Sequence, residues 1–376
     1  MENDRSRHFT SRVIEDLDAK IRLSNSNSDR NVLFARKAFA LARFSLVQDA
    51  RNIIGSLREV NQSFETRLSA WIMFAEGIIE HSANLDVAKS KDRVLRAHLV
   101  GQVANDPTLA GTSAAWLAFF CFQQGRYVET KDYLVKAFSW TKNEDSEGRS
   151  RACLVMGMGF LYAGEFKKGQ MWMQLARANA VKSGDIAMQN IIFFNSSAYH
   201  AARLTLLDCT STVDPEELNF ALMSAQSSSN LNTALGILNQ VSLIPIQRAE
   251  LLTIEKKWNL AVDLFDQYLA QAKDDGQSPW IPKFIAQRAW CKANLADKDG
   301  AISDIEQAIA LSAQCIDPDD RAVLHLRVSS TAKLLGDNSR SAREHALGEQ
   351  HLSLFHDQQA LVLSYFKEVA EAYPQN

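Results

Sequence analysis

The sequence repeats with a period of 40 residues, and this period constrains the fold more than any other feature. Ala249 recurs as Ala289, and Ala261 recurs as Ala301, each 40 positions later. The stretch from 249 to 311 therefore holds most of two units, each with two apolar helical segments around a short turn. A unit of this length cannot bury its apolar face alone, so successive units must stack. The predicted fold is an all-α solenoid of antiparallel helix pairs.

Two ladders of small residues carry this period along the chain. On the first helix of the units they are Ala38, Ala118, Gly157, Ala198, Ala249, Ala289 and Ser329, and on the second helix Ala50, Ser90, Thr130, Gly169, Ala261, Ala301 and Ser341. Small side chains let neighbouring helices approach closely, so we expect both ladders to be buried. Ala198 and Ala249 are 51 positions apart rather than 40. This difference predicts an insertion or irregular segment near residues 208–232.

Composition excludes several classes of protein. Seven prolines and 16 glycines in 376 residues are few, which favours long helices over strands. The five cysteines include no CxxC pair, so neither a disulfide framework nor a zinc site is indicated. A net charge of -3 gives no bulk attraction to nucleic acid or to a membrane surface. Without a signal peptide or a long apolar run, we expect a cytoplasmic protein with no membrane span.

Three regions follow from the patterning. Residues 1–30 are expected to form an N-terminal helix, Arg5 to Leu23, followed by a polar linker. The repeats are expected to cover residues 31–347. Residues 348–376 are expected to form a C-terminal capping helix, because the stretch from Gly348 to Tyr373 is amphipathic and comes after the last ladder position.

The residue order within a unit resembles the tetratricopeptide repeat. It reads small, glycine, aromatic, small, apolar, small at Ala118, Gly125, Tyr127, Thr130, Leu134 and Ala137, and Ala289, Ala301, Ile305 and Ala308 match the second half. The usual period of that family is about 34 residues. A 40-residue period is similar to the long-helix variant in the helical sensor domains of bacterial signalling regulators. The resemblance covers about residues 31–348 and implies a right-handed superhelical solenoid of about eight repeats.

The resemblance also implies a concave groove lined by the first helix of each unit. Carried over to this sequence, the groove residues are Phe39, Phe119, Met158, Tyr162, Tyr199, Glu250, Trp290 and Asn294. Aromatic anchors and a flexible methionine suit a surface that recognises peptides. In the alternative interpretation, these aromatic side chains pack inside the superhelix against the next unit.

A second candidate surface is basic, and no catalytic or metal site is indicated. Lys89, Arg93 and Arg96 share one helical face, which is either a docking face for an anionic partner or an ordinary solvated face. No phosphate-binding loop is present, and the histidines lack the i, i+4 spacing of a metal pair. The sequence therefore predicts no enzyme, no cofactor and no metal.

Two functional hypotheses remain. The first is a non-enzymatic scaffold or adaptor that binds a protein or peptide segment in the groove and acts in regulation. The second is a ligand- or peptide-gated sensor module of a bacterial signalling system, with a transcriptional or cyclic-dinucleotide output. Direct nucleic-acid binding is not expected, since no base-stacking platform or recognition helix is evident. The partner and the oligomeric state stay open.

Overall fold

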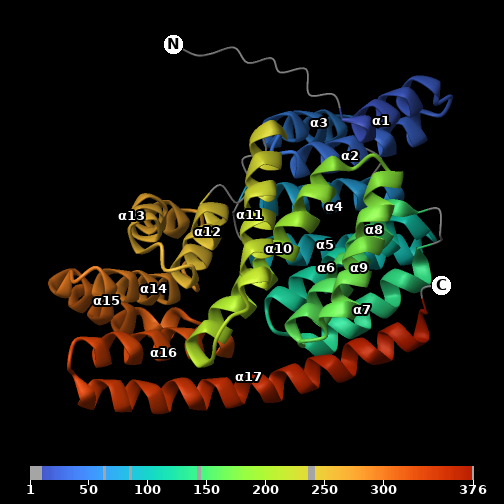
Figure 1. The fold of residues 1–376 in the computed structure, drawn as a ribbon. Coiled ribbons are helices and arrows are strands. Elements are labelled where there is room, and N and C mark those ends of the chain that lie inside the picture. Colours follow the sequence, from blue (N-terminus) through green and yellow to red (C-terminus); the bar gives the residue numbers. More distant parts are fainter. Residues whose placement is uncertain (1–10, 62–64, 84–86, 142–144, 236–241, 375–376) are drawn as a thin grey trace, which may run out of the picture. The chain divides into compact units, whose positions relative to one another are not determined.

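The structure, a computed structural model, describes residues 11–61, 65–83, 87–141, 145–235 and 242–374. Within these ranges, α-helices follow one another from α1 to α17, with one short 3-10 helix, η1, and no strand (Figure 1). The predicted all-α class is confirmed. No helix in the same ranges combines the length and the apolar character needed to cross a membrane.

The helices form consecutive antiparallel pairs. Their bounds are α1 Arg12–Leu23, α2 Asn27–Arg43, α3 Val47–Val60, α4 Thr66–Ser82, α5 Val87–Val103, α6 Pro107–Gln123, α7 Tyr127–Trp140, α8 Ser146–Tyr162, α9 Phe166–Lys182, α10 Ile186–Thr210, α11 Pro215–Leu235, α12 Leu243–Ile254, α13 Trp258–Asp274, α14 Ile281–Asn294, α15 Lys298–Leu311, α16 Pro318–Leu334 and α17 Asn338–Ala372, with η1 at Ser312–Gln314. We call the first helix of each pair, the even-numbered helices α2 to α16, the leading helices.

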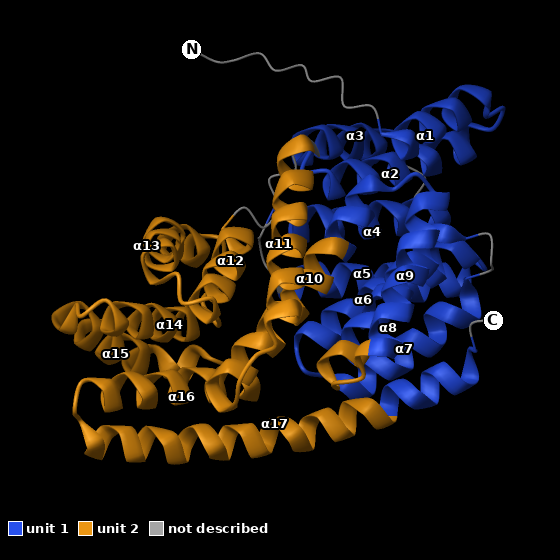
Figure 2. Cartoon of the chain, in the orientation of Figure 1, with its two compact units in different colours: residues 1–159, 167–192, 365–376 blue, residues 160–166, 193–364 orange. Residues whose placement is uncertain are grey.

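Contacts divide the chain into two compact units (Figure 2). Unit 1 comprises Met1–Gly159, Lys167–Ile192 and Tyr365–Asn376, and unit 2 comprises Phe160–Phe166 and Phe193–Ser364. Within unit 1, α2 packs against α4, and α4 and α6 pack against their partners α5 and α7. Within unit 2, α14 packs against α12, α15 and α16. Each unit is therefore a stack of helix hairpins.

The small-residue ladders lie where these helices meet. Ala38, Ala118, Ala249 and Ala289 are fully buried. At two positions a small polar residue joins the helices of a pair, because Ser90 Oγ donates to the Gly77 carbonyl at 2.6 Å and Ser329 Oγ to the Ser341 carbonyl at 2.8 Å. A Cβ added at Gly77 would lie 2.8 Å from Val94 Cγ2, so a larger residue would force α4 and α5 apart. Close packing through the smallest side chains is confirmed at these positions, whereas Ala198 and Ser341 are only half-buried.

In six of the helix pairs, the turn between the two helices holds a residue in the left-handed region. Positive φ angles occur in this turn at Gly125, Gly164 and Gly336, and also at the non-glycine residues Ser45, Lys256 and Ala296. The turn closes the leading helix by a backbone hydrogen bond, as between Asp297 N and the Lys292 carbonyl at 3.0 Å. A side chain at this conformation is strained, whereas glycine adopts it freely.

Aspartates start three successive leading helices. Asp106 and Asp185 each accept a hydrogen bond from a backbone N–H in the first turn, from Leu109 N at 3.0 Å and Met188 N at 2.9 Å. Asp145 accepts a longer bond from Gly148 N at 3.4 Å. These carboxylates cap the helix and complement its dipole.

Three boundaries differ from the sequence-based expectation. The extra residues near 208–232 lengthen α10 and α11 to 25 and 21 residues, and a short loop joins these two helices. Gly348 does not start a separate capping helix, because α17 runs without a break from Asn338 to Ala372. A Cβ at Gly348 would lie 2.7 Å from Leu326 Cγ, so this glycine permits close packing. The N-terminal helix begins at Arg12, and the expected residues before Ser11 lie outside the described ranges.

Candidate functional site

A row of polar side chains follows the 40-residue period through three leading helices of unit 2. Gln247 on α12, Gln287 on α14 and Arg327 on α16 occupy the same position of successive repeats. Their side chains are 7%, 0% and 2% exposed. We call these three residues the polar row. Buried polar groups are costly unless they are hydrogen-bonded, so the partners of the polar row decide what it can do.

Arg327 holds one end of the polar row. Its Nε donates to Gln287 Oε1 at 2.8 Å, and its Nη2 forms an ion pair with Asp208 of α10. The guanidinium carbon also lies 5.8 Å from the ring centre of Trp290. Burial alone would lower the pKa of Arg327. Electrostatic interaction with Cys209 and Asp208, together with the hydrogen bond to Asp208, raises it instead. This arginine is therefore a charged, fixed part of the unit.

A buried ion cluster lies beside the polar row. Lys283 Nζ is 2.9 Å from Asp320 Oδ1 and 3.3 Å from Glu250 Oε1. Burial alone would lower the pKa of Lys283, yet these two carboxylates raise it. Burial raises the pKa of Glu250, and burial with the neighbouring Asp320 raises the pKa of Asp317 to about 6. The carboxylates here are only partly balanced by Lys283.

Several buried atoms of this region lack a hydrogen-bond partner within the described chain. They are Gln247 Oε1, Gln287 Nε2, Glu250 Oε1 and Asp319 Oδ1. Two of them belong to side-chain amides, which can accept from and donate to a peptide backbone. The other two are carboxyl oxygens. Glu250 Oε1 already faces the Lys283 ammonium at 3.3 Å, so only Asp319 Oδ1 lacks an ion-pair partner within the described chain and could receive a cationic group. The arrangement can therefore receive an extended chain that carries a basic side chain.

The aromatic and methionine groove residues of unit 1 are buried. Phe39, Phe119 and Met158 are 1%, 6% and 3% exposed. The ring centre of Phe39 lies 4.9 Å from that of Phe74 and 6.4 Å from that of Trp116. Phe39 thus packs against side chains of the following leading helices, as the alternative interpretation describes, and all three residues are buried in this structure.

The groove residues predicted in unit 2 are more varied. Glu250 is buried in the ion cluster, whereas Tyr162, Tyr199 and Trp290 are half-buried and Asn294 is exposed. Trp290 packs edge-on against Trp258, with ring centres 6.2 Å apart. The structure brings Glu250 and Trp290 together with the polar row.

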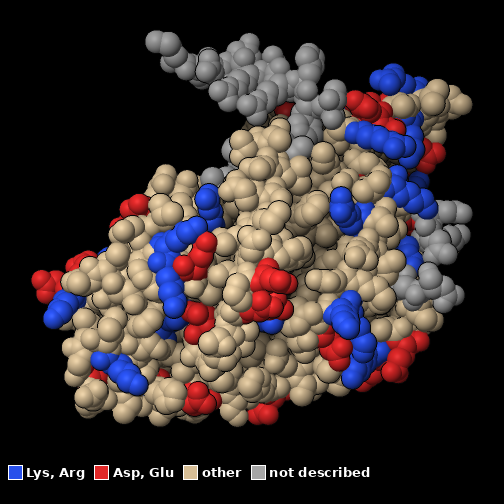
Figure 3. Space-filling model, in the orientation of Figure 1, with Lys and Arg blue, Asp and Glu red and all other residues tan. Residues whose placement is uncertain are grey.

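The basic face is neutralised within unit 1. Arg93 forms ion pairs with Glu76 and with Glu80, the latter at 3.2 Å, and Lys89 Nζ lies 3.5 Å from Glu80. Arg96 pairs with Asp92 on the same helix at 2.9 Å. These pairs support the interpretation as an ordinary solvated face. Figure 3 likewise shows cationic and anionic side chains interspersed on the face it draws.

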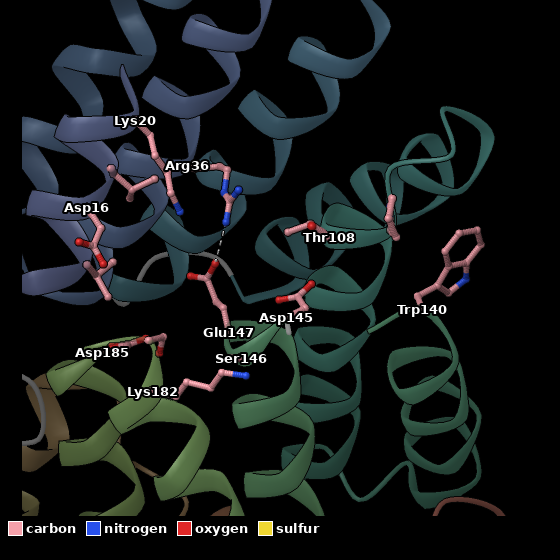
Figure 4. Close-up of a pocket in the computed structure, with 14 residues that line it drawn as sticks. Asp16, Lys20, Arg36, Thr108, Trp140, Asp145, Ser146, Glu147, Lys182 and Asp185 are labelled. Carbon is pink, nitrogen blue, oxygen red and sulfur yellow. Dashed lines mark ion pairs between the residues drawn. The ribbon is translucent and has the colours of Figure 1, made fainter. Parts of the chain in front are cut away.

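Unit 1 also contains a cavity of about 480 Å³. It is lined by α1 and α2, by the starts of α6, α8 and α10, and by the ends of α7 and α9. Figure 4 shows Lys20 and Arg36 on one side and Asp145 with Thr108 on the other, while the ring of Trp140 points away. Arg36 lies 3.7 Å from Glu147, and burial together with Glu147 raises the pKa of Asp145 to about 6. Volume and polarity fit a small polar molecule.

The geometry places the protein among the all-α helical-repeat proteins of the tetratricopeptide-like type. Its fold is similar to that of a Rap protein crystallised in complex with competence and sporulation factor, with a TM-score of 0.58, 12% identity and 92% of each chain covered. The apo form of RapI matches with a TM-score of 0.47 and 11% identity, over 90% of this chain and 91% of that one. No family model and no curated protein matches the sequence. At 12% sequence identity, the match to the Rap protein complex shows similarity of fold alone.

The polar row was missed by sequence reasoning. Its signal was present, because Gln247, Gln287 and Arg327 are spaced by the same 40 residues as the ladders. Polar residues on a helix are ordinarily solvated, so only burial distinguishes these three. The groove prediction named Glu250 and Trp290 instead. These residues lie three positions after Gln247 and Gln287, which is about one helical turn.

Proposed function

We propose that the protein is a non-enzymatic regulatory scaffold that binds an extended peptide segment along the leading helices of unit 2. One observation carries the proposal: Gln247 and Gln287 hold buried amide atoms without partners at the repeat spacing. An extended backbone offers carbonyl and N–H groups that would satisfy them. The fold supports this role, since a similar Rap protein forms a complex with competence and sporulation factor.

The surrounding charges define the preferred segment. Asp319 keeps a carboxyl oxygen without a hydrogen bond, whereas Glu250 and Asp320 both face the cation of Lys283. A lysine or arginine of the ligand would pair with the Asp319 oxygen in a water-poor setting, where such bonds are strong. Trp290 offers an aromatic face beside the polar row. The ligand is therefore a short peptide, or an exposed segment of a protein, with at least one basic side chain.

Selection from a hexapeptide library followed by fluorescence anisotropy tests the proposal. Trp290→Ala should weaken binding about 30-fold, equivalent to about 2 kcal/mol, as expected for a buried anchor. Gln287→Ala should weaken it about tenfold, because ligand groups lose their partner. Gln267→Ala, on the exposed face of α13, is the matched control and should bind like the unaltered protein. Equal affinity for all three variants would refute the proposal.

A second candidate function is a small-molecule sensor, favoured by the cavity of unit 1. The starts of three leading helices meet there with Lys20, Arg36 and Asp145. A molecule that binds the folded state raises its melting temperature by linkage. A thermal-shift screen of polar metabolites, repeated with Arg36→Gln, would show a shift that this variant abolishes.

A further inference from the structure

The cavity of unit 1 carries opposite charges on its two sides. Lys20 and Arg36 lie on one side, and Asp145 lies on the other (Figure 4). The volume of about 480 Å³ is within the range of about 300–1,000 Å³ that is usual for small-molecule sites. The described residues that line the cavity all belong to unit 1. The chemistry of a ligand therefore follows from the partners that each side already has.

Asp145 brings a carboxyl group without a cation to one side. In the described ranges, its one hydrogen bond is a long one, which Oδ1 accepts from the backbone N–H of Gly148 at 3.4 Å. No cationic side chain of these ranges lies within ion-pair distance of Asp145. Burial and the nearby charge of Glu147 raise the pKa of this carboxyl to about 6, and Arg36 offsets only part of this rise. The carboxyl is still mostly ionised at neutral pH, so a cationic partner would stabilise it.

The opposite side brings cations whose hydrogen-bonding capacity is not filled. Lys20 makes no ion pair or hydrogen bond with the part of the chain that the structure describes. Arg36 lies 3.7 Å from Glu147, which is too long for a hydrogen bond, and its buried Nε has no partner there. Glu147 also lies 3.7 Å from Arg43, so its charge is shared between two arginines. Lys20 and Arg36 can thus donate to the oxygens of a carboxylate.

The other charged side chains that line the cavity are already engaged. They are Asp185, which pairs with Arg43; Asp16, which lies 3.9 Å from Arg12; and Lys182. Among the described residues, the cavity thus holds one unpaired charge of each sign, on Asp145 and on Lys20, and no ion pair joins the two. A ligand with a single charge would leave one of them unpaired. A ligand with one charge of each sign would satisfy both.

We propose that the cavity of unit 1 binds a small zwitterion, an α-amino acid or a longer ω-amino acid, with its ammonium group toward Asp145 and its carboxylate toward Lys20 and Arg36. The hydroxyl groups of Thr108 and Ser146 also line the cavity and can accept further hydrogen bonds from the ammonium group. This assignment rests on the second candidate function, because it takes the cavity as a small-molecule site and names the class of ligand. It is independent of the peptide site in unit 2.

A panel of matched compounds tests the ligand class by isothermal titration calorimetry and thermal shift. The zwitterions are L-leucine, β-alanine, δ-aminovalerate and ε-aminocaproate. Each is compared with the amine that lacks its carboxylate and with the acid that lacks its ammonium group. At least one zwitterion should raise the melting temperature and bind at least about tenfold more tightly than both of its analogues, because each analogue leaves one charge of the cavity unpaired.

Substitutions assign the two ends of the ligand. Asp145→Asn should weaken zwitterion binding at least about tenfold without weakening the acid analogue. Asparagine is as good a helix cap as aspartate and removes a buried charge, so weaker binding would not reflect unfolding. The double variant Lys20→Gln and Arg36→Gln should weaken the zwitterion and spare the amine. Asp132→Asn on α7 and Arg22→Gln on α1, both exposed and outside the cavity, are the matched controls.

Three outcomes overturn the zwitterion site. In the first, an amine or an acid binds as tightly as its zwitterion, so the cavity takes small molecules of another class. In the second, zwitterion binding is unchanged in Asp145→Asn and in the double variant. In the third, no zwitterion of the panel binds the unaltered protein. The metabolite screen then decides the sensor role separately: a different ligand whose shift is lost in Arg36→Gln keeps that role, and the absence of any such ligand ends it.

Discussion

Within unit 1, the end of α17 packs against α6 and α8 through Phe366, which faces Gly159, and this contact permits a test of the packing. Phe366 is fully buried and meets Phe122 edge-on, with ring centres 5.9 Å apart. A Cβ placed on Gly159 of α8 would lie 2.0 Å from Cε1 of the Phe366 ring, which is a severe clash. Gly159 therefore makes room for the ring, and the two residues are coupled energetically.

The magnitudes follow from burial and from helix propensity. Phe366→Ala should destabilise the protein by about 3–5 kcal/mol, the usual cost of removing a buried ring. Gly159→Ala gains about 1 kcal/mol in helix propensity but costs about 1–3 kcal/mol in overpacking. Once the ring has been removed, only the gain remains. Gly159→Ala should thus stabilise the Phe366→Ala protein by about 1 kcal/mol, giving a coupling of about 1–3 kcal/mol.

Urea unfolding followed by circular dichroism and tryptophan fluorescence measures this cycle, and limited proteolysis reports release of the C-terminal segment. Gly55 of α3 provides the control, because a Cβ there would meet no atom within 4 Å. Gly55→Ala should stabilise both backgrounds by about 1 kcal/mol. The reasoning is refuted if Gly159→Ala stabilises the unaltered protein as much as Gly55→Ala does, or if the two substitutions are additive.

Three further predictions concern buried charges. Arg327→Met should cost about 1–3 kcal/mol in urea unfolding, because the buried Gln287 Oε1 loses its donor and the part-buried Asp208 loses its cation; a neutral result would contradict these contacts. Asp106→Ala should lower the free energy of unfolding by about 2–4 kcal/mol. It removes a helix cap, and it leaves Trp71 Nε1, which lies 2.9 Å from the carboxylate, without a partner. Asp106→Asn should recover part of this loss. The pKa of Asp145 is raised to about 6, so the folded state holds this proton more tightly and stability falls as pH rises from about 4 to 6. Asp145→Asn should remove that dependence and be more stable by about 1–2 kcal/mol at neutral pH; identical pH profiles would refute the shift.

The fold could be predicted because its determinants are local and periodic. A small residue at each helix crossing and a turn near the middle of each unit recur every 40 residues, and both are legible without knowledge of distant contacts. The long α17 was mispredicted for a related reason. Gly348 was taken as a boundary, but its role is to admit Leu326, a residue of the preceding helix. From the sequence alone, a glycine that ends a helix cannot be distinguished from a glycine that permits close packing.

The candidate site could be predicted only in part, because its chemistry depends on distant residues. Arg327 finds Asp208 119 positions away, and Arg43 finds Asp185 142 positions away. Neither pairing has a local sequence signal. Phe39 was assigned to an open groove, yet the next two leading helices enclose it.

The strained turns at Ser45, Lys256 and Ala296 give the protein a reserve of stability. Each holds a side chain in a backbone conformation that the equivalent turns assign to glycine. Replacement by glycine would relieve about 1 kcal/mol at a turn, less the entropy that glycine adds to the unfolded chain. A destabilising substitution at a recognition residue could therefore be compensated by a glycine substitution at one of these turns, in evolution or in protein engineering. New binding preferences can evolve on such a scaffold without rebuilding its core.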